Sequence, residues 1–131
     1  MKLQKLVYYS QAWWLAHRGV PLFDEPIEAW AHGPVVYALF DRHRGQFIVG
    51  PTWPPGDSSR LTGEERVHVG SVVHCYGEKS AAELSELTHA EQPWQQARAG
   101  LGPRERASAV ISHGAMQDFY GAQLRRASAA R

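Results

Sequence analysis

The pattern of hydrophobic and polar positions along the chain predicts a series of helices. Residues 3–17 place large apolar side chains at steps of three and four, which is typical of one face of an amphipathic helix. Gly19 and Pro21 should end this helix, because glycine suits a helix C-terminus and proline cannot continue one. The same spacing over residues 116–124 predicts a last helix, and we expect the basic, alanine-rich end at residues 125–131 to fray.

Two signatures of a helix start lie in the middle of the chain. The pairs Thr62–Glu65 and Ser80–Glu83 have the spacing of a capping box, in which a hydroxyl and a carboxylate satisfy two backbone N–H groups. They predict helices over residues 62–77 and 80–89. A further short helix should begin at Gln92, because the proline that follows suits the first helical turn.

Prolines and β-favouring residues interrupt this helical pattern. Residues 20–30 contain two prolines and a loose alternation of apolar and polar positions, which indicates a short strand or loop. The Gly33–Pro34 pair has the form of a helix start, since proline needs no N–H group in the first turn. Residues 47–49 favour a brief strand, and the proline-rich residues 50–59 predict an exposed loop that carries Trp53.

These elements predict a mainly α fold, a single compact multi-helix domain over residues 1–131 with one or two short extended segments. The length of 131 residues and the 44% hydrophobic content suit one domain with one core, and no internal repeat is visible. We expect one core to collect apolar residues from most of these elements: Leu6, Trp13, Trp30, Val36, Leu39, Val72, Leu84, Trp94 and Phe119.

The charge balance does not identify a partner. The chain has 14 Lys and Arg against 13 Asp and Glu, for a net charge of +1, so it has no strong overall field for nucleic acid or membrane. Residues 98–131 contain six arginines, which we interpret as a solvated helix end, with a phosphate-binding or acidic-protein-binding patch as the alternative. The absence of a long apolar run predicts no membrane span, and the single cysteine fits a cytoplasmic protein.

No group of residues matches a known catalytic or metal-binding pattern. Of the seven histidines, the closest grouping is His68 and His74 with Cys75, and only two of these three share a helical face. Cys75 stands beside valines and a tyrosine, so we expect a small core residue rather than a nucleophile. The sequence therefore predicts no enzyme, no metal and no cofactor.

Three sequence motifs follow one another along the chain. They are KLQKLVYYSQAW at residues 2–13, IEAWAHGPVV at residues 27–36 and THAEQPW at residues 88–94. In this order they resemble the Panacea domain, the phage-associated family of SocA-like antitoxin domains, and the resemblance spans nearly the whole chain. Family members usually have another helix before the first motif, so we expect that helix to be missing here. We expect structural roles for the motif residues Lys5, Leu6, Tyr9, Trp30, Gly33, Pro34, Val35, His89, Pro93 and Trp94.

The resemblance implies a bacterial or phage antitoxin that neutralises a cognate protein toxin, encoded nearby, by direct binding. Aromatic and arginine residues outside the expected core are the natural anchors for such a partner, and a homo-oligomer could use the same side chains. The candidate partner-binding residues are Trp53, Tyr37, Arg42 and Arg44.

Two other functions stay open at this stage. The C-terminal arginines could serve a nucleic-acid-binding regulator. A small hydrolase or transferase could use a histidine pocket around His32 and His89, although His89 could equally close a helix end by bonding to backbone carbonyls.

Overall fold

Six helices and one two-stranded hairpin make up the part of the chain that the computed structural model describes, namely residues 2–43, 61–102, 104, 105 and 107–129. The helices are α1 (Lys2–Arg18), α2 (Tyr37–His43), α3 (Gly63–Tyr76), α4 (Ala81–His89), α5 (Gln92–Ala97) and α6 (His113–Ala129). The strands are β1 (Ile27–Trp30) and β2 (Gly33–Val36). The mainly α fold is therefore confirmed. The strand expected at residues 47–49 and the loop expected at residues 50–59 lie outside the described residues.

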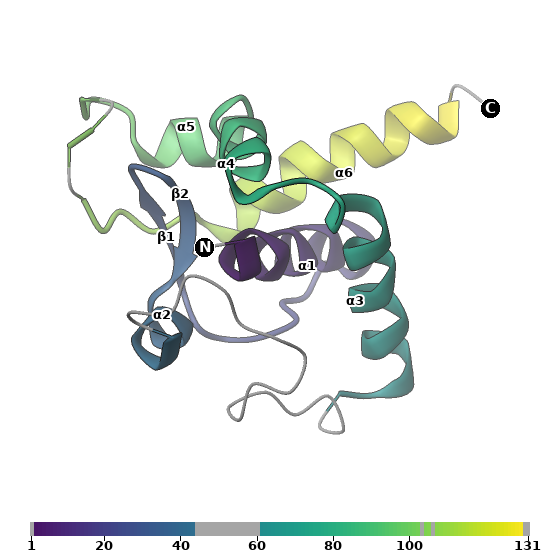
Figure 1. The fold of residues 1–131 in the computed structure, drawn as a ribbon. Coiled ribbons are helices and arrows are strands. Elements are labelled where there is room, and N and C mark those ends of the chain that lie inside the picture. The colour runs from purple at the N-terminus through teal and green to yellow at the C-terminus, as the bar shows by residue number, and fades with distance from the viewer. Residues whose placement is uncertain (1, 44–60, 103, 106, 130–131) are drawn as a thin grey trace.

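Helix α1 lies at the centre of the fold, with the hairpin on one side and α3 on the other (Figure 1). It also packs against α6 and α4. The buried core gathers around it and consists of Tyr8, Tyr9, Ala12, Leu15, Ile27, Ala29, Val36, Val72, Leu84, Ile111, Met116 and Tyr120.

Most of the expected core residues lie in this core or against it. Val36, Val72 and Leu84 are buried in it, while five others pack against it half-buried: Leu6, Trp13, Leu39, Trp94 and Phe119. The expectation for Trp30 is wrong. Along β1, Ile27 and Ala29 point into the core, so Trp30 belongs to the opposite face and is only half-buried.

The helix boundaries predicted from capping signals are confirmed. The Thr62 hydroxyl accepts the Glu65 N–H at 3.2 Å, and the Glu65 carboxylate accepts the Thr62 N–H at 2.8 Å. Ser80 and Glu83 make the same reciprocal pair at the start of α4. At the end of α1, Gly19 has a φ of +73°, a value that favours glycine.

The helix expected to start at Gly33 and Pro34 is wrong, because both residues belong to β2 and the helix begins at Tyr37. β1 and β2 are antiparallel, with Trp30 opposite Gly33 and Ala29 opposite Pro34. In this register the backbone nitrogen of Pro34 points away from β1, so the missing N–H costs no hydrogen bond between the strands.

Gly33 is required both by its backbone and by its neighbours. Its φ is +120°, which side-chain-bearing residues rarely adopt, and it follows the two-residue turn of the hairpin. A Cβ atom added there would lie 2.6 Å from Cε of Lys5 and 3.1 Å from the hydroxyl of Thr88. The hairpin and the first helix can therefore approach this closely only at a glycine.

We expect Gly33→Ala to lower the free energy of unfolding by about 2–4 kcal/mol, because strained backbone and a displaced Lys5 side chain add together. Urea unfolding at neutral pH measures this loss. The matched control is Gly70→Ala in the middle of α3, where nothing lies within 4 Å of an added Cβ. It should gain about 0.5–1 kcal/mol. Equal effects of the two substitutions would contradict the role assigned to Gly33.

A third extended segment, residues 109–111, runs along the other edge of β1. The N–H group of Ala29 donates to the carbonyl of Ala109 at 2.8 Å, and the N–H group of Ile111 donates to the carbonyl of Ile27 at 2.8 Å. Glu28 and Val110 form the antiparallel bridge between these two bonds. β1 is therefore flanked on both sides, by β2 and by this segment.

Within the described residues, none of the helices combines the length and the apolar character that a membrane crossing needs.

Candidate functional site: the β1–β2 hairpin and its aromatic cavity

Side chains of α1 bind the outer edge of β2. The Gln4 side-chain amide pairs with both backbone groups of Val36: its oxygen accepts the N–H at 2.8 Å and its nitrogen donates to the carbonyl at 3.3 Å. From the next residue of α1, Nζ of Lys5 lies 3.4 Å from the carbonyl oxygen of Pro34. Both side chains are fully buried. Gln4 thus takes the place that a neighbouring peptide group would have in a wider sheet.

Side chains from α4, α5 and the residue after α5 bind the rest of the hairpin. The Ser85 hydroxyl donates to the carbonyl of His32 at 2.6 Å, and Nε1 of Trp94 donates to the carbonyl of Trp30 at 2.8 Å. The guanidinium of Arg98 donates to the carbonyl of Ala29 at 2.9 Å. The hairpin therefore has its carbonyls occupied by side chains that come from three separate parts of the sequence, and all three sequence motifs meet here.

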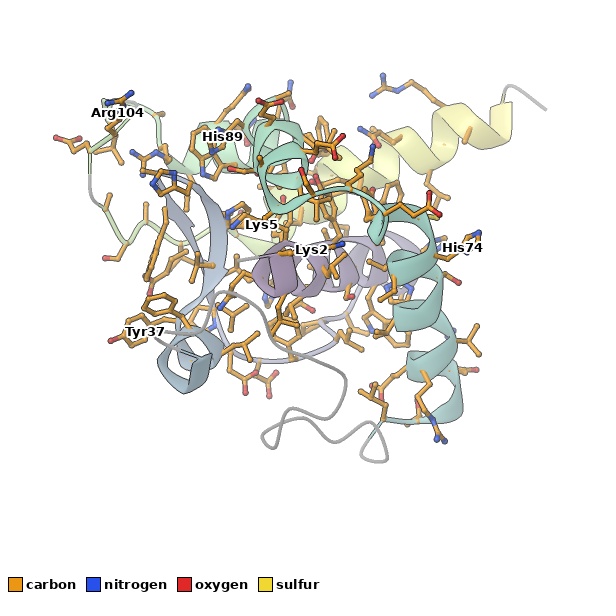
Figure 2. All side chains as sticks on the ribbon, viewed as in Figure 1. Lys2, Lys5, Tyr37, His74, His89 and Arg104 are labelled. Carbon is orange, nitrogen blue, oxygen red and sulfur yellow. The ribbon has the colours of Figure 1, made fainter. Side chains whose placement is uncertain are left out.

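Lys5 is a buried cation in this arrangement. It is 1% exposed and lies beneath Gly33, with the Thr88 hydroxyl and the ring of His89 nearby. Figure 2 shows Lys5 on the first turns of α1, below the end of α4 that carries His89. Burial lowers the pKa of the Lys5 amine to about 8.

We expect this buried amine to make the stability of the protein depend on pH in alkaline solution. Its pKa is lower in the folded protein than in the unfolded chain, so the unfolded chain binds the extra proton between pH 8 and 10.5. The free energy of unfolding should therefore rise with pH from about 8 to 10, by up to about 3 kcal/mol. Urea unfolding across this range should show the rise in the wild type and lose it in Lys5→Met. A rise that persists in Lys5→Met would contradict the assignment.

A second buried group, one helical turn further along the same face of α1, centres on Glu91. One carboxylate oxygen of Glu91 accepts the hydroxyl of Tyr9 at 2.6 Å and that of Tyr120 at 2.9 Å. The hydroxyls of Tyr8 and Tyr120 lie 3.0 Å apart, and the ring of Tyr76 stacks on Tyr9 with centroids 4.1 Å apart. Burial raises the pKa of the Glu91 carboxyl and also that of the three tyrosines bonded around it. This group joins α1 to α6 and to the start of α5.

A cavity of about 880 Å³ lies on the outer face of the hairpin, away from the core. Trp30, Tyr37 and Phe40 form its aromatic wall, in which the Trp30 and Phe40 rings meet edge to face with centroids 4.9 Å apart. The Tyr37 ring lies 6.3 Å from each of the other two. The remaining lining residues are Glu28, Ala31, His32, Arg104, Ala107 and Ser108.

The cavity combines an apolar wall with a polar rim. Arg104 and His32 are exposed at its edge, and Figure 2 shows Tyr37 and Arg104 at opposite ends of the hairpin on the same side of the molecule. The carboxylate of Glu28 accepts Nε1 of Trp30 at 2.9 Å. An aromatic wall with hydrogen-bonding groups at its rim is typical of ligand and protein recognition sites.

The structure places one of the four candidate partner-binding residues in this cavity. Tyr37 lines it and is 46% exposed. Trp53 and Arg44 lie outside the described residues, and so does the side chain of Arg42, although its backbone belongs to α2.

The proposed histidine pocket does not form around both histidines. His32 lines the cavity, whereas the His89 ring stacks on Trp94 with centroids 4.1 Å apart. The His89 ring bonds to the backbone of Ala31 in the hairpin turn, so the expectation that it closes a helix end is wrong. Burial lowers the pKa of His89. Among the described residues no group of three His, Cys, Asp or Glu could hold a metal ion.

Two single residues differ from their expected environments. Cys75 is exposed on α3 rather than packed in the core, because only Val72 of that helix is buried. The sequence pattern predicts a solvated Arg98, but this side chain is 5% exposed and donates to three backbone carbonyls. Gln4 and Glu91 were not singled out at all, although a polar residue on an otherwise apolar helix face is the signal that could have marked Gln4.

Comparisons with known proteins agree with the motifs. Residues 3–95 match the family described as Antitoxin SocA-like, Panacea domain. The curated protein Antitoxin SocA of Caulobacter vibrioides (strain NA1000 / CB15N) is 30% identical over 119 residues, a match that covers 78% of this chain and 61% of the relative. The chain thus spans less than two thirds of that relative's length. No solved structure gives a significant match. The matched region contains α1, the hairpin and the side chains of α4 and α5 that bind it, and the chain belongs to the SocA-like Panacea domain family of antitoxins.

Proposed function

We propose that this protein neutralises a cognate protein toxin by direct binding, in the cytoplasm, and that the aromatic cavity of the hairpin is part of the binding surface. Membership of an antitoxin family supports the general role. The observation that carries the specific proposal is the cavity itself. It is lined by the exposed Tyr37 at the start of α2 and by the half-buried Trp30 of the hairpin, whose backbone is fixed by buried side chains.

A rigid support matters because binding through a fixed surface costs little conformational entropy. The aromatic side chains that supply most of the affinity in protein interfaces are then presented in one geometry. Tyr37 starts α2 directly after β2, so its position follows from that of the hairpin. The motif residues beneath the hairpin would act as its support, and the cavity residues as the contact surface.

The nucleic-acid alternative loses support from the structure. Arg98 is buried and its guanidinium is occupied by carbonyls, so it is not part of a surface patch. The exposed arginines at the end of α6 have no aromatic neighbours in the sequence on which bases could stack.

Co-expression with the product of the adjacent reading frame tests the proposal. The wild type should restore growth and copurify with the toxin. Tyr37→Ala should weaken toxin binding by about 30-fold, the effect of removing one aromatic hot spot, while the melting temperature stays nearly unchanged. Substitutions of Trp53, Arg42 and Arg44 belong in the same series.

The matched control is Val67→Ala, which truncates an exposed residue, 71% accessible, on α3. It should leave growth rescue and binding at the wild-type level. If Tyr37→Ala bound the toxin as tightly as Val67→Ala does, the cavity would not be the contact surface. If the wild type neither bound nor neutralised the product, the antitoxin function itself would be withdrawn for this chain.

A further inference from the structure

The segment at residues 109–111 presents an open sheet edge beside the aromatic cavity. Its hydrogen bonds to β1 use the carbonyl of Ala109 and the N–H group of Ile111. Val110, between them, stands opposite Glu28 in the bridge, and in an antiparallel pair of this kind the N–H and carbonyl of such a residue point away from the partner strand. Both backbone groups of Val110 therefore face outward.

Nothing in the described part of the chain covers this edge. No hydrogen bond joins the N–H or carbonyl of Val110 to another described residue, and its side chain is 57% exposed. An unpaired edge with an exposed β-branched side chain is the arrangement to which a further strand can add. At the outer edge of β2, by contrast, Gln4 and Lys5 occupy the backbone groups.

The open edge and the cavity are continuous, because Ala107 and Ser108 line the cavity just before Val110 in the chain. Val110 also shares a face with Glu28, its cross-strand partner, and Glu28 lines the cavity. A strand added at about 4.8 Å from Val110 would place its long side chains on that face at the mouth of the cavity.

The charges at this mouth favour an acidic occupant. Arg104 is exposed at the rim and makes no salt bridge with any described residue. Lys5 and Arg98 add positive charge behind the hairpin. Glu28 is the single carboxylate among the described residues that line the cavity, and it already accepts a hydrogen bond from the tryptophan beside it.

We propose that the toxin contributes an extended, acidic segment that adds as a strand to the edge at Val110, with an apolar side chain in the aromatic cavity and a carboxylate against Arg104. This inference rests on the proposed antitoxin function and names the form and charge of the part that is bound. Main-chain hydrogen bonds to Val110 would fix the register of the added strand. The cavity and Arg104 would select for its apolar and acidic side chains.

The first experiment uses overlapping 12-residue synthetic peptides that cover the toxin sequence, together with the intact toxin. One peptide with at least one Asp or Glu and a large apolar residue should bind the full-length protein. Its binding should slow hydrogen exchange at the Val110 amide by at least 10-fold, because a new hydrogen bond protects that group. Changing its acidic residue to the amide should weaken binding by about 10-fold.

Two matched pairs of variants locate the contact. Val110→Pro removes the outward N–H without removing a bond to β1, whereas Val110→Thr keeps both the N–H and the branched shape. Arg104→Glu reverses the rim charge, whereas Arg104→Lys keeps it. The first member of each pair should weaken toxin binding by at least 10-fold, the second should not, and all four should melt near the wild-type temperature.

The outcomes separate this inference from the proposed function. If the wild type binds and neutralises the toxin but Val110→Pro does so equally well and exchange at Val110 is unchanged, strand addition is wrong and the antitoxin role stands. If Val110→Pro instead lowers the mass of the assembly that the protein forms in solution without toxin, the edge pairs with a second copy of this chain. The inference is then equally overturned. If the wild type binds no toxin, the proposed function fails first.

Discussion

Arg98→Ala should lower the free energy of unfolding by about 3–5 kcal/mol, one of the two largest losses that we expect from a single substitution in this protein. The Arg98 guanidinium donates to the carbonyls of Ala29, Gly102 and Glu105, at 2.9, 2.9 and 2.6 Å. It also lies over the ring of Trp94, 5.4 Å from its centroid. Truncation leaves three carbonyls without this donor, at about 1–3 kcal/mol for a buried one, and removes the cation–π contact.

Two controls make the Arg98 result specific. Arg98→Lys keeps the charge but cannot reach three carbonyls with one ammonium group, so it should give an intermediate loss. Arg125→Ala, on the exposed end of α6, should change the stability by less than about 0.5 kcal/mol. Guanidinium unfolding followed by tryptophan fluorescence measures all three. A loss for Arg98→Ala no larger than that for Arg125→Ala would show that the hairpin does not depend on this side chain.

The helix boundaries could be predicted from the sequence because the interactions that set them are local. Thr62 and Glu65 satisfy each other's backbone groups within one turn, and Ser80 and Glu83 do the same. Such a signal depends on no residue elsewhere in the chain, so its spacing alone carries the prediction.

The hairpin could not be predicted in the same way, because Gly33 and Pro34 suit two different structures. A proline after a glycine fits the first turn of a helix, and it fits equally well an edge strand in which its nitrogen faces away from the partner. The strand is favoured here by Gln4, 32 residues away in the sequence, whose side-chain oxygen accepts a hydrogen bond from the N–H group of Val36. Local propensity contains nothing of this contact.

Burial was the other quantity that residue type predicted poorly. Cys75 is exposed because α3 buries little of its surface. Lys5, Glu91 and Arg98 can be buried because each forms hydrogen bonds to other parts of the fold. These partners come from distant segments, so a charged residue in the sequence resembles any other surface residue. The motif resemblance marked Lys5 as structural, but only the structure shows what it binds.

The cavity was visible in the sequence only through Tyr37, an aromatic residue beside a turn. Of the other aromatic wall residues, the sequence pattern predicts a core position for Trp30, and no motif includes Phe40. Their grouping depends on the antiparallel register of the hairpin, which turns Trp30 outward. Because the sequence pattern predicts a helix start at Gly33 and Pro34 in place of the hairpin, it does not predict the candidate site either.

Substitutions of Glu91 should separate the contribution of its hydrogen bonds from that of its charge. Glu91→Leu leaves the hydroxyls of Tyr9 and Tyr120 without their shared acceptor, and we expect a loss of about 3–4 kcal/mol in the free energy of unfolding. Glu91→Gln keeps an acceptor oxygen of the same shape and removes the buried charge. At pH 7 it should therefore be at least as stable as the wild type.

The dependence on pH provides the decisive comparison between Glu91 and Glu91→Gln. Burial raises the pKa of Glu91 in the folded protein above the value of about 4.5 that it has in the unfolded chain. The proton on this carboxyl therefore stabilises the folded protein. This stabilisation is complete below pH 4.5 and is lost as the pH rises through the folded pKa. On acidification from pH 7 to pH 4.5 the wild type should thus gain stability relative to Glu91→Gln. The difference between their free energies of unfolding should therefore shrink. Urea unfolding of both proteins at each pH measures this directly. A difference that stays constant, or that grows toward acid, would mean that Glu91 is not held as a buried carboxylate whose charge opposes folding.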